Sequence, residues 1–95
     1  ELFHFGKDMS TDEVLAELDK QGYRPATLKE LLPLGEKYPN LQREFPIIAL
    51  GSVWRDSNGN RFCPYLGRDG SERNLDLRWV GRRWGDGCRF AVVRK

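Results

Sequence analysis

Histidine and cysteine, which supply most nucleophilic, acid–base and zinc sites, are scarce in this chain of 95 residues. The single histidine, His4, stands between two phenylalanines, where a structural or exposed role is typical. A zinc site needs about four nitrogen or sulfur ligands, and His4, Cys63 and Cys88 supply at most three. A Cys-His or Ser-His-Asp site would require the fold to bring His4 against a nucleophile. We therefore expect no catalytic residue, no metal and no cofactor.

Two other motifs resemble ligand loops, but their spacing is wrong. Asp56, Asn58 and Asn60 look like the start of a calcium loop, yet Gly59 is out of register and no glutamate follows at the twelfth position. The glycines of the Gly81 to Gly87 stretch lack the strand-to-helix context of a phosphate cradle. The first stretch is interpreted as a turn, and the second as a loop or irregular hairpin around Trp84.

Long apolar runs are also lacking. No run is longer than Ile47 to Leu50, which falls far short of the roughly 20 residues that cross a bilayer. No secretory signal is visible, so we expect a cytoplasmic protein without membrane association. Two cysteines can form one disulfide, but two reduced thiols suit that location better. The length and the 39% apolar content are typical of one thin domain over residues 1–95.

Charge is distributed unevenly along the chain. Residues 1–47 hold six Lys or Arg against nine Asp or Glu, whereas residues 48–95 hold ten against five. The basic half is almost entirely arginine, with Lys95 its only lysine. Arginine pairs carboxylates or phosphates and stacks on aromatic rings, so this bias indicates a recognition face or a solvated rim.

Residues 1–44 carry the helical signals. The capping box Ser10-Thr11-Asp12-Glu13 predicts a helix over Thr11 to Gln21, closed by Gly22. A second capping box at Thr27-Leu28-Lys29-Glu30 begins another helix, in which Pro33 and Gly35 predict a kink or a frayed last turn. The remaining elements expected in this half are a strand at Phe3 to Phe5 and a helical turn at Leu41 to Glu44.

From residue 45 the apolar pattern alternates as in strands. The Asn58-Gly59 pair predicts a hairpin between Ser52 to Arg55 and Arg61 to Tyr65. A second turn is expected at Gly67 to Gly70, followed by a strand in which Leu75, Leu77 and Trp79 face the core. A final strand covers Phe90 to Arg94. The fold class is therefore α+β, with two helices packed on a small, mostly antiparallel sheet.

The stretch Arg78 to Arg89 stands out because it holds two of the three tryptophans and four arginines. Tryptophan and arginine are the residues most enriched at binding hot spots. Trp79 and Trp84 can also anchor a small core, and we favour this core role over a binding role for both. The residues around them follow neither a helical nor a strand period, which is typical of a surface free to vary.

Two segments resemble a known family. Gly22-Tyr23-Arg24-Pro25-Ala26-Thr27-Leu28-Lys29-Glu30-Leu31 resembles the signature Gly-Tyr-Arg-Leu-Pro-Thr-Glu-x-Glu-Trp of formylglycine-generating-type, C-type-lectin-like domains. The ending Cys88-Arg89-Phe90-Ala91-Val92-Val93-Arg94 resembles the terminal Gly-Phe-Arg strand of that family. The resemblance implies a compact C-type-lectin-like fold with the order strand, two helices, irregular strands, a Trp-containing loop and a last strand.

The same fold carries the variable proteins of diversity-generating retroelements, whose C-terminal segment is diversified at template adenines. The resemblance implies a variable segment over residues 76–88. The implied diversified, ligand-binding positions are Asp76, Arg78, Val80, Gly81, Arg82, Arg83, Gly85, Asp86, Gly87 and Cys88. The implied scaffold anchors are Leu75, Leu77, Trp79, Trp84, Arg89 and Phe90. Arg78, Val80 to Arg83 and Gly85 to Cys88 can each arise from an AAC or AAT codon by adenine changes alone.

The chain also departs from the family. Pro25-Ala26 stands in place of Leu-Pro, and Gly51-Ser52-Val53-Trp54 is a remnant of a longer motif. The cysteine pair and iron-binding histidines of the family's enzymes, and the calcium-binding patterns of lectins, have no equivalents. We therefore expect a non-enzymatic protein that binds a protein ligand. The alternative is a small Arg-rich nucleic-acid-binding or phage regulatory protein, although no reader motif supports it.

Overall fold

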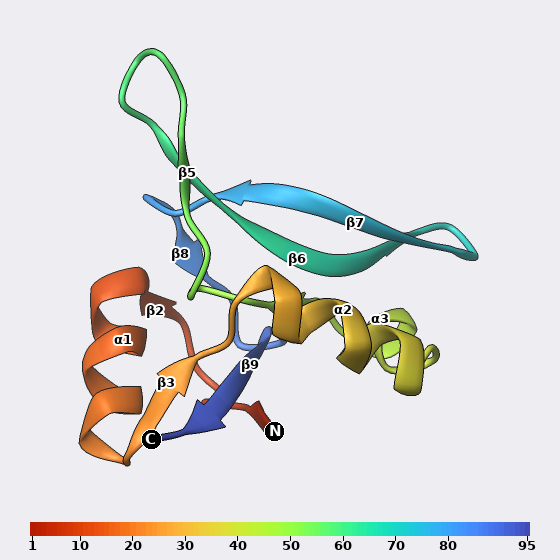
Figure 1. Cartoon of the computed structure of the whole chain (residues 1–95), viewed down its shortest axis with the longest axis horizontal. Helices are drawn as coiled ribbons and strands as arrows, with labels where there is room; N and C mark the ends of the chain where they lie inside the picture. Colours follow the sequence, from red (N-terminus) through yellow and green to blue (C-terminus); the bar gives the residue numbers. More distant parts are fainter.

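The N-terminal half folds into three helices, as the computed structural model of residues 1–95 shows (Figure 1). They are α1 (Thr11–Lys20), α2 (Leu28–Lys37) and the short α3 (Leu41–Glu44). The capping box of α1 is confirmed: the Glu13 backbone N–H donates to Ser10 Oγ at 3.2 Å, and the Ser10 N–H donates to Glu13 Oε1 at 2.8 Å. Gly22 follows the helix with φ +83°, as a C-terminal glycine should.

The start of α2 is also held by its predicted cap. The Thr27 backbone N–H donates to Glu30 Oε1 at 2.9 Å, and Arg24 pairs with Glu30 Oε2 at 2.7 Å. The hydrogen bonds from Arg24, with those from Thr27, lower the pKa of Glu30 to about 2. The expected fraying near Gly35 does not occur, because α2 runs through Pro33 to Lys37. Gly35 instead allows close packing, since a Cβ there would lie 2.7 Å from Leu66 Cδ1.

A seven-stranded sheet forms the centre of the molecule, and it is mostly antiparallel as expected. Its main path is β1 (Leu2–Phe3), β9 (Arg89–Arg94), β4 (Ile47–Ile48), β6 (Arg61–Asp69) and β5 (Trp54–Arg55). In addition, β3 (Tyr23–Pro25) pairs with β9, and β7 (Glu72–Trp79) pairs with β6. Only the β4–β9 pairing is parallel. A separate two-stranded sheet joins β2 (Met9–Ser10) to β8 (Arg83–Trp84).

The hairpins lie close to where the sequence places them. Gly59, with φ +85°, turns the β5–β6 hairpin, and the Asp56 carboxylate accepts the backbone N–H groups of Asn58 and Asn60. The second turn lies at Gly70-Ser71, because Gly67 belongs to β6. The N-terminal strand is Leu2–Phe3 rather than Phe3 to Phe5, since only these residues reach Ala91 and Phe90 of β9.

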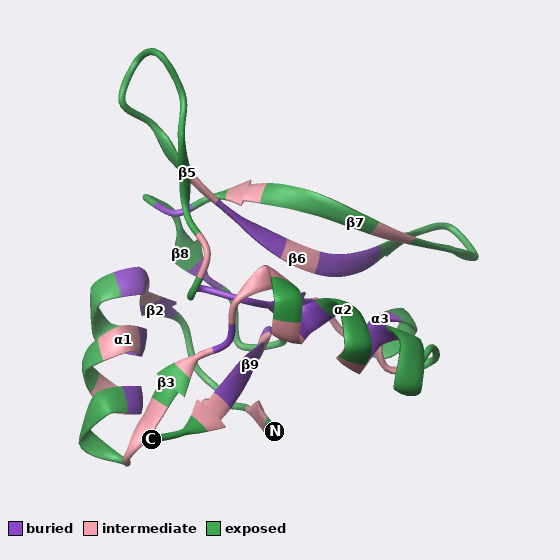
Figure 2. Ribbon diagram, in the orientation of Figure 1, coloured by how far each residue is buried: buried purple, intermediate pink, exposed green.

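The core lies on both faces of β4, whose short apolar run is buried throughout. Ile48 belongs to a cluster with Val14 and Leu18 of α1, whereas Ile47 belongs to a cluster with Leu31 of α2. The two helices therefore pack on opposite faces of the central strands, and the α+β class is confirmed with a third, short helix. The β6–β7 hairpin extends beyond this covered region, and β7 is mostly exposed (Figures 1 and 2).

Candidate ligand-binding surface

The segment that follows β7 alternates between buried single residues and exposed triplets. Val80, Trp84 and Cys88 are buried, and they recur at every fourth position. Between them, residues 81–83 and residues 85–87 are all exposed. The two triplets are thus displayed on the surface by three side chains that reach into the core.

A buried hydroxyl group holds the first part of this segment. Thr11, the first residue of α1, donates its hydroxyl to the carbonyl oxygen of Val80 at 2.6 Å and accepts the Trp84 indole N–H at 2.9 Å. The Trp84 ring also packs edge-on against Phe90, with 5.9 Å between ring centroids. One side chain therefore satisfies both the Val80 carbonyl and the Trp84 indole N–H.

Residues near the N-terminus hold residues 80–88 in place from outside the core. Arg83 Nε donates to Asp8 Oδ2 at 2.8 Å, and the Arg83 guanidinium lies 3.4 Å from Glu13 Oε1. The ring nitrogen Nε2 of His4 is 2.8 Å from the carbonyl oxygen of Asp86. The only histidine thus bonds to the loop backbone.

Two of the positions predicted to face a ligand do not lie on the surface. Val80 and Cys88 are 3% and 8% exposed, so the prediction that they belong to the binding surface is wrong. Their side chains fill the core beside Trp84. The chain passes repeatedly between surface and core here, so some of its side chains must be buried. Asp76, Gly81, Arg82, Arg83, Gly85, Asp86 and Gly87 are exposed, and Arg78 is half-buried.

Three of the six predicted anchors are not anchors. Leu75, Leu77 and Trp79 alternate along β7 as expected, but each remains about half exposed, at 48%, 49% and 51%. Their face of β7 approaches a helix only at Leu75, which lines a hollow together with Leu32 and Gly35 of α2. Trp84 and Phe90 are confirmed as buried, and Arg89 is half-buried. The alternation of β7 is correct, but the burial expected of its apolar face is wrong.

Three arginines of the surface are held by aromatic rings rather than by carboxylates. The guanidinium carbons of Arg78, Arg82 and Arg89 lie 4.4, 5.7 and 4.2 Å from the ring centroids of Tyr65, Trp84 and Phe45, respectively. None of the four ion pairs of the chain includes them. Stacked guanidinium groups keep their outer N–H donors available for a partner.

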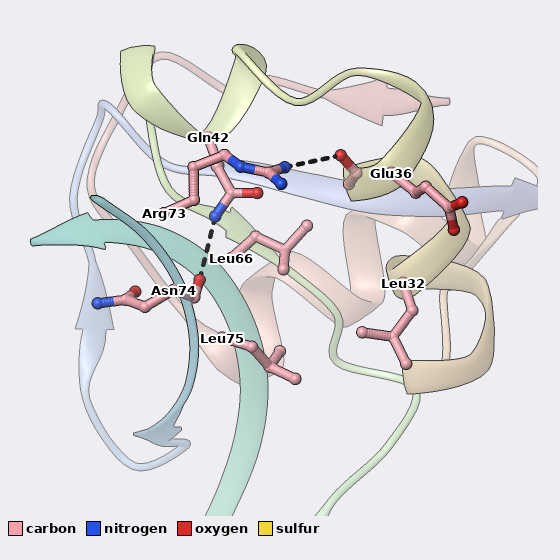
Figure 3. A pocket seen from close by; sticks show the side chains of 8 residues that line it. Leu32, Glu36, Gln42, Leu66, Arg73, Asn74 and Leu75 are labelled. Carbon is pink, nitrogen blue, oxygen red and sulfur yellow. Dashed lines mark hydrogen bonds between the residues drawn. The ribbon is translucent and has the colours of Figure 1, made fainter. Parts of the chain in front are cut away.

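A hollow of about 230 Å³ opens beside this cluster. Tyr65 and Phe45 line it together with Arg68 and Arg78, and Glu44 supplies its one carboxylate. Its lining therefore combines aromatic rings with positive charge. A second hollow, between α2 and the β6–β7 hairpin, differs in that its polar groups bond mainly to one another (Figure 3).

Hydrogen bonds within this second hollow satisfy its polar groups, except the buried Asn74 Oδ1, which has no partner. Gln42 Nε2 donates to the carbonyl oxygens of Gly67 and Asn74, at 2.7 and 3.1 Å. Arg73 donates to the carbonyl oxygen of Gly35 at 3.1 Å (Figure 3). These contacts join the helices to the hairpin, which is a structural role.

Glycines at the exposed triplets leave room for other side chains. A Cβ placed on Gly85 or Gly87 meets no atom within 4 Å, and neither residue has a positive φ. Replacing either by serine or asparagine should therefore change the free energy of unfolding by less than about 0.5 kcal/mol. Urea unfolding measures this directly.

The matched control is Gly81, where a Cβ would lie 2.7 Å from the Trp79 ring. Gly81→Ser should cost more than Gly85→Ser, because the indole must move. Equal costs at the two positions would contradict the packing described for Trp79.

The two cysteines are buried free thiols in the core beneath the surface. Burial raises the pKa of Cys63 to about 12 and also raises the pKa of Cys88. Both thiols are thus held in the protonated form at neutral pH, which disfavours nucleophilic attack. No three His, Cys, Asp or Glu side chains gather in a metal-binding arrangement. None of the helices has the length and apolar content needed to cross a bilayer.

Comparison with known proteins identifies no relative of this chain. No family model matches the chain, and no curated protein or solved structure matches it significantly. The architecture is therefore defined at the level of an α+β domain. Sequence reasoning found Trp84 and the exposed triplets, but it missed Thr11, because a capping-box threonine gives no sign of a tertiary contact.

Proposed function

We propose that this chain is a non-enzymatic ligand-binding protein, the variable protein of a diversity-generating retroelement in a compact C-type-lectin-like fold. The observation that supports it best is the four-residue spacing of Val80, Trp84 and Cys88, with an exposed triplet in each interval. Such a frame lets the side chains of the triplets change while the core contacts stay constant. The order β1, α1, α2, irregular strands, Trp84 loop and β9 agrees with the family order.

The ligand we propose is a protein that presents acidic groups. Arg78, Arg82 and Arg89 offer guanidinium donors without carboxylate partners, and the hollow beside Arg78 adds two aromatic rings. A carboxylate of the ligand would gain bidentate hydrogen bonds there without displacing an existing ion pair. The arginines are then one selected set of side chains among many that the frame can carry.

The deciding test is genomic. We expect a near-copy of the 3′ coding sequence beside a reverse-transcriptase gene, differing from it only at template adenines. The structure sharpens this expectation: the differences should fall in the codons of residues 81–83 and 85–87 and spare the codon of Trp84. Differences at bases other than adenine, or a preference for codons of buried residues, would exclude the proposal.

The same arginines, which lack carboxylate partners, favour a second candidate, a nucleic-acid-binding protein. Phosphates would then replace carboxylates as partners of Arg78, Arg82 and Arg89. Gel shifts with a generic duplex at increasing salt separate the two candidates. Tight binding that weakens steeply with salt would favour the nucleic-acid reading, whereas no shift at low salt would favour the protein ligand.

A further inference from the structure

β7 is an edge strand whose outer backbone groups have no neighbouring strand. It pairs with β6 on one side only, and Figure 1 shows it along the outer margin of the sheet. Eight residues make it one of the two longest strands of the molecule. A long, exposed edge strand with apolar side chains is a ready template for pairing with another strand.

The register of the β6–β7 hairpin shows which backbone groups face outward. Asp69 and Glu72 close a two-residue turn, so Leu75, Leu77 and Trp79 fall at the pairs whose backbone groups point away from β6. The contacts agree with this assignment. The Leu77 N–H bonds to the carboxylate of its neighbour Asp76 at 2.8 Å, while the carbonyl of its opposite residue Pro64 turns to Ala49.

The side chains of β7 divide into two faces. Leu75, Leu77 and Trp79 form an apolar face that is about half exposed. Asp76 and Arg78 lie on the opposite face with opposite charges, two positions apart. When a second copy of the strand runs antiparallel to the first, apolar side chains can face apolar ones and the Asp of one strand can face the Arg of the other.

We propose that two copies of this chain associate through their β7 edges, in antiparallel register about a twofold axis at Leu77. Leu77 then lies opposite Leu77 of the second copy, and Leu75 lies opposite the second copy's Trp79. Asp76 lies opposite the second copy's Arg78, and the pair occurs twice. The outward N–H and C=O groups of the three apolar residues bond across the axis, and the Leu77 N–H exchanges its bond to Asp76 Oδ1 for one to the second copy. The sheet then continues from one copy to the other.

The charges select this register over its neighbours. Sliding one strand by two residues in one direction places Asp76 opposite Asp76, so that like charges face each other. The same shift places Arg73 opposite Trp79. Sliding it further places Arg73 opposite Leu77 and leaves Trp79 beyond the apolar ladder. Only the register about Leu77 pairs every apolar side chain with an apolar one and both charges with their opposites.

The interface is small, so the dimer should be weak, with a dissociation constant between about 10 μM and 1 mM. It shares Asp76 and Arg78 with the positions assigned to the ligand site and otherwise involves a different surface. The exposed triplets at residues 81–83 and 85–87 remain outside the paired strands. Self-association and ligand binding can therefore be tested separately, and a failure of one leaves the other standing.

The test exchanges the charges of the two paired positions. In Asp76→Arg, both cross-axis pairs become Arg–Arg; in Arg78→Asp, both become Asp–Asp. Sedimentation equilibrium should show self-association at least about tenfold weaker for each variant than for the original chain. An equimolar mixture of the two variants should recover the original affinity, because every pair across the mixed interface is again Arg opposite Asp.

The mixture separates a lost contact from a damaged fold, since an unfolded variant cannot be rescued by its partner. Circular dichroism of each variant alone checks its folding independently. A chain that stays monomeric at about 1 mM would overturn the proposal. Two single variants that dimerise as well as the original chain, or a mixture that associates no better than either variant, would overturn it too.

Discussion

Replacing Trp84 by alanine is expected to destabilise the fold by about 3 to 5 kcal/mol. The Trp84 side chain is 1% exposed and is the largest fully buried side chain of the molecule, so its removal leaves a large cavity beside Phe90. A domain of this length has a free energy of unfolding of only about 5 to 15 kcal/mol. Urea unfolding followed by circular dichroism should therefore show a much lower midpoint, or a chain that is partly unfolded in buffer.

Trp79→Ala is the matched control, because the same residue type is removed from the same segment. Trp79 is 51% exposed, so this substitution should cost less than about 1 kcal/mol. The contrast between the two variants decides which tryptophan anchors the segment. Equal destabilisation would show that Trp79 is packed in solution and would contradict the exposed face of β7.

Replacing Thr11 by valine should cost about 2 to 4 kcal/mol, although the two side chains have nearly the same shape. The change removes the hydroxyl that donates to the Val80 carbonyl and accepts the Trp84 indole N–H. Two buried polar groups then lose their partners, and each carries a desolvation cost of about 1 to 3 kcal/mol. Chemical unfolding gives the total, and indole N–H exchange should accelerate in the variant.

Thr11→Ser keeps the hydroxyl and should cost much less than Thr11→Val. A double variant that adds Trp84→Phe to Thr11→Val removes the indole donor as well, so part of the penalty should disappear in a double-mutant cycle. If valine and serine were equally tolerated at this position, the hydroxyl would have no role in holding the segment.

The local elements could be predicted because their signals lie within a few residues. The two capping boxes place the starts of α1 and α2 correctly, since Ser10 and Thr27 meet partners three residues later in the chain. The turn at Gly59 was predictable for the same reason. Pro33 misled the prediction, because packing of α2 on β6 sustains the helix beyond it.

The candidate surface was predicted only in part. Trp84 and Phe90 are buried as expected, and the residues around Trp84 are exposed. The sequence predicts Val80 and Cys88 on the surface, because an irregular stretch offers no period from which burial can be inferred. Their four-residue spacing from Trp84 becomes meaningful only when the path of the chain over the core is known.

The sequence by itself determined the helix caps, the hairpin turns and the alternation of β7, because each depends on contacts between near neighbours. It also determined that Asp76 and Arg78 share one face while Leu75, Leu77 and Trp79 share the other. Which face is covered was decided only by the tertiary structure. The helices pack around β4 and reach β7 only near Arg73 to Leu75, so most of an apolar face that the sequence pattern assigns to the core is exposed at the edge of the sheet.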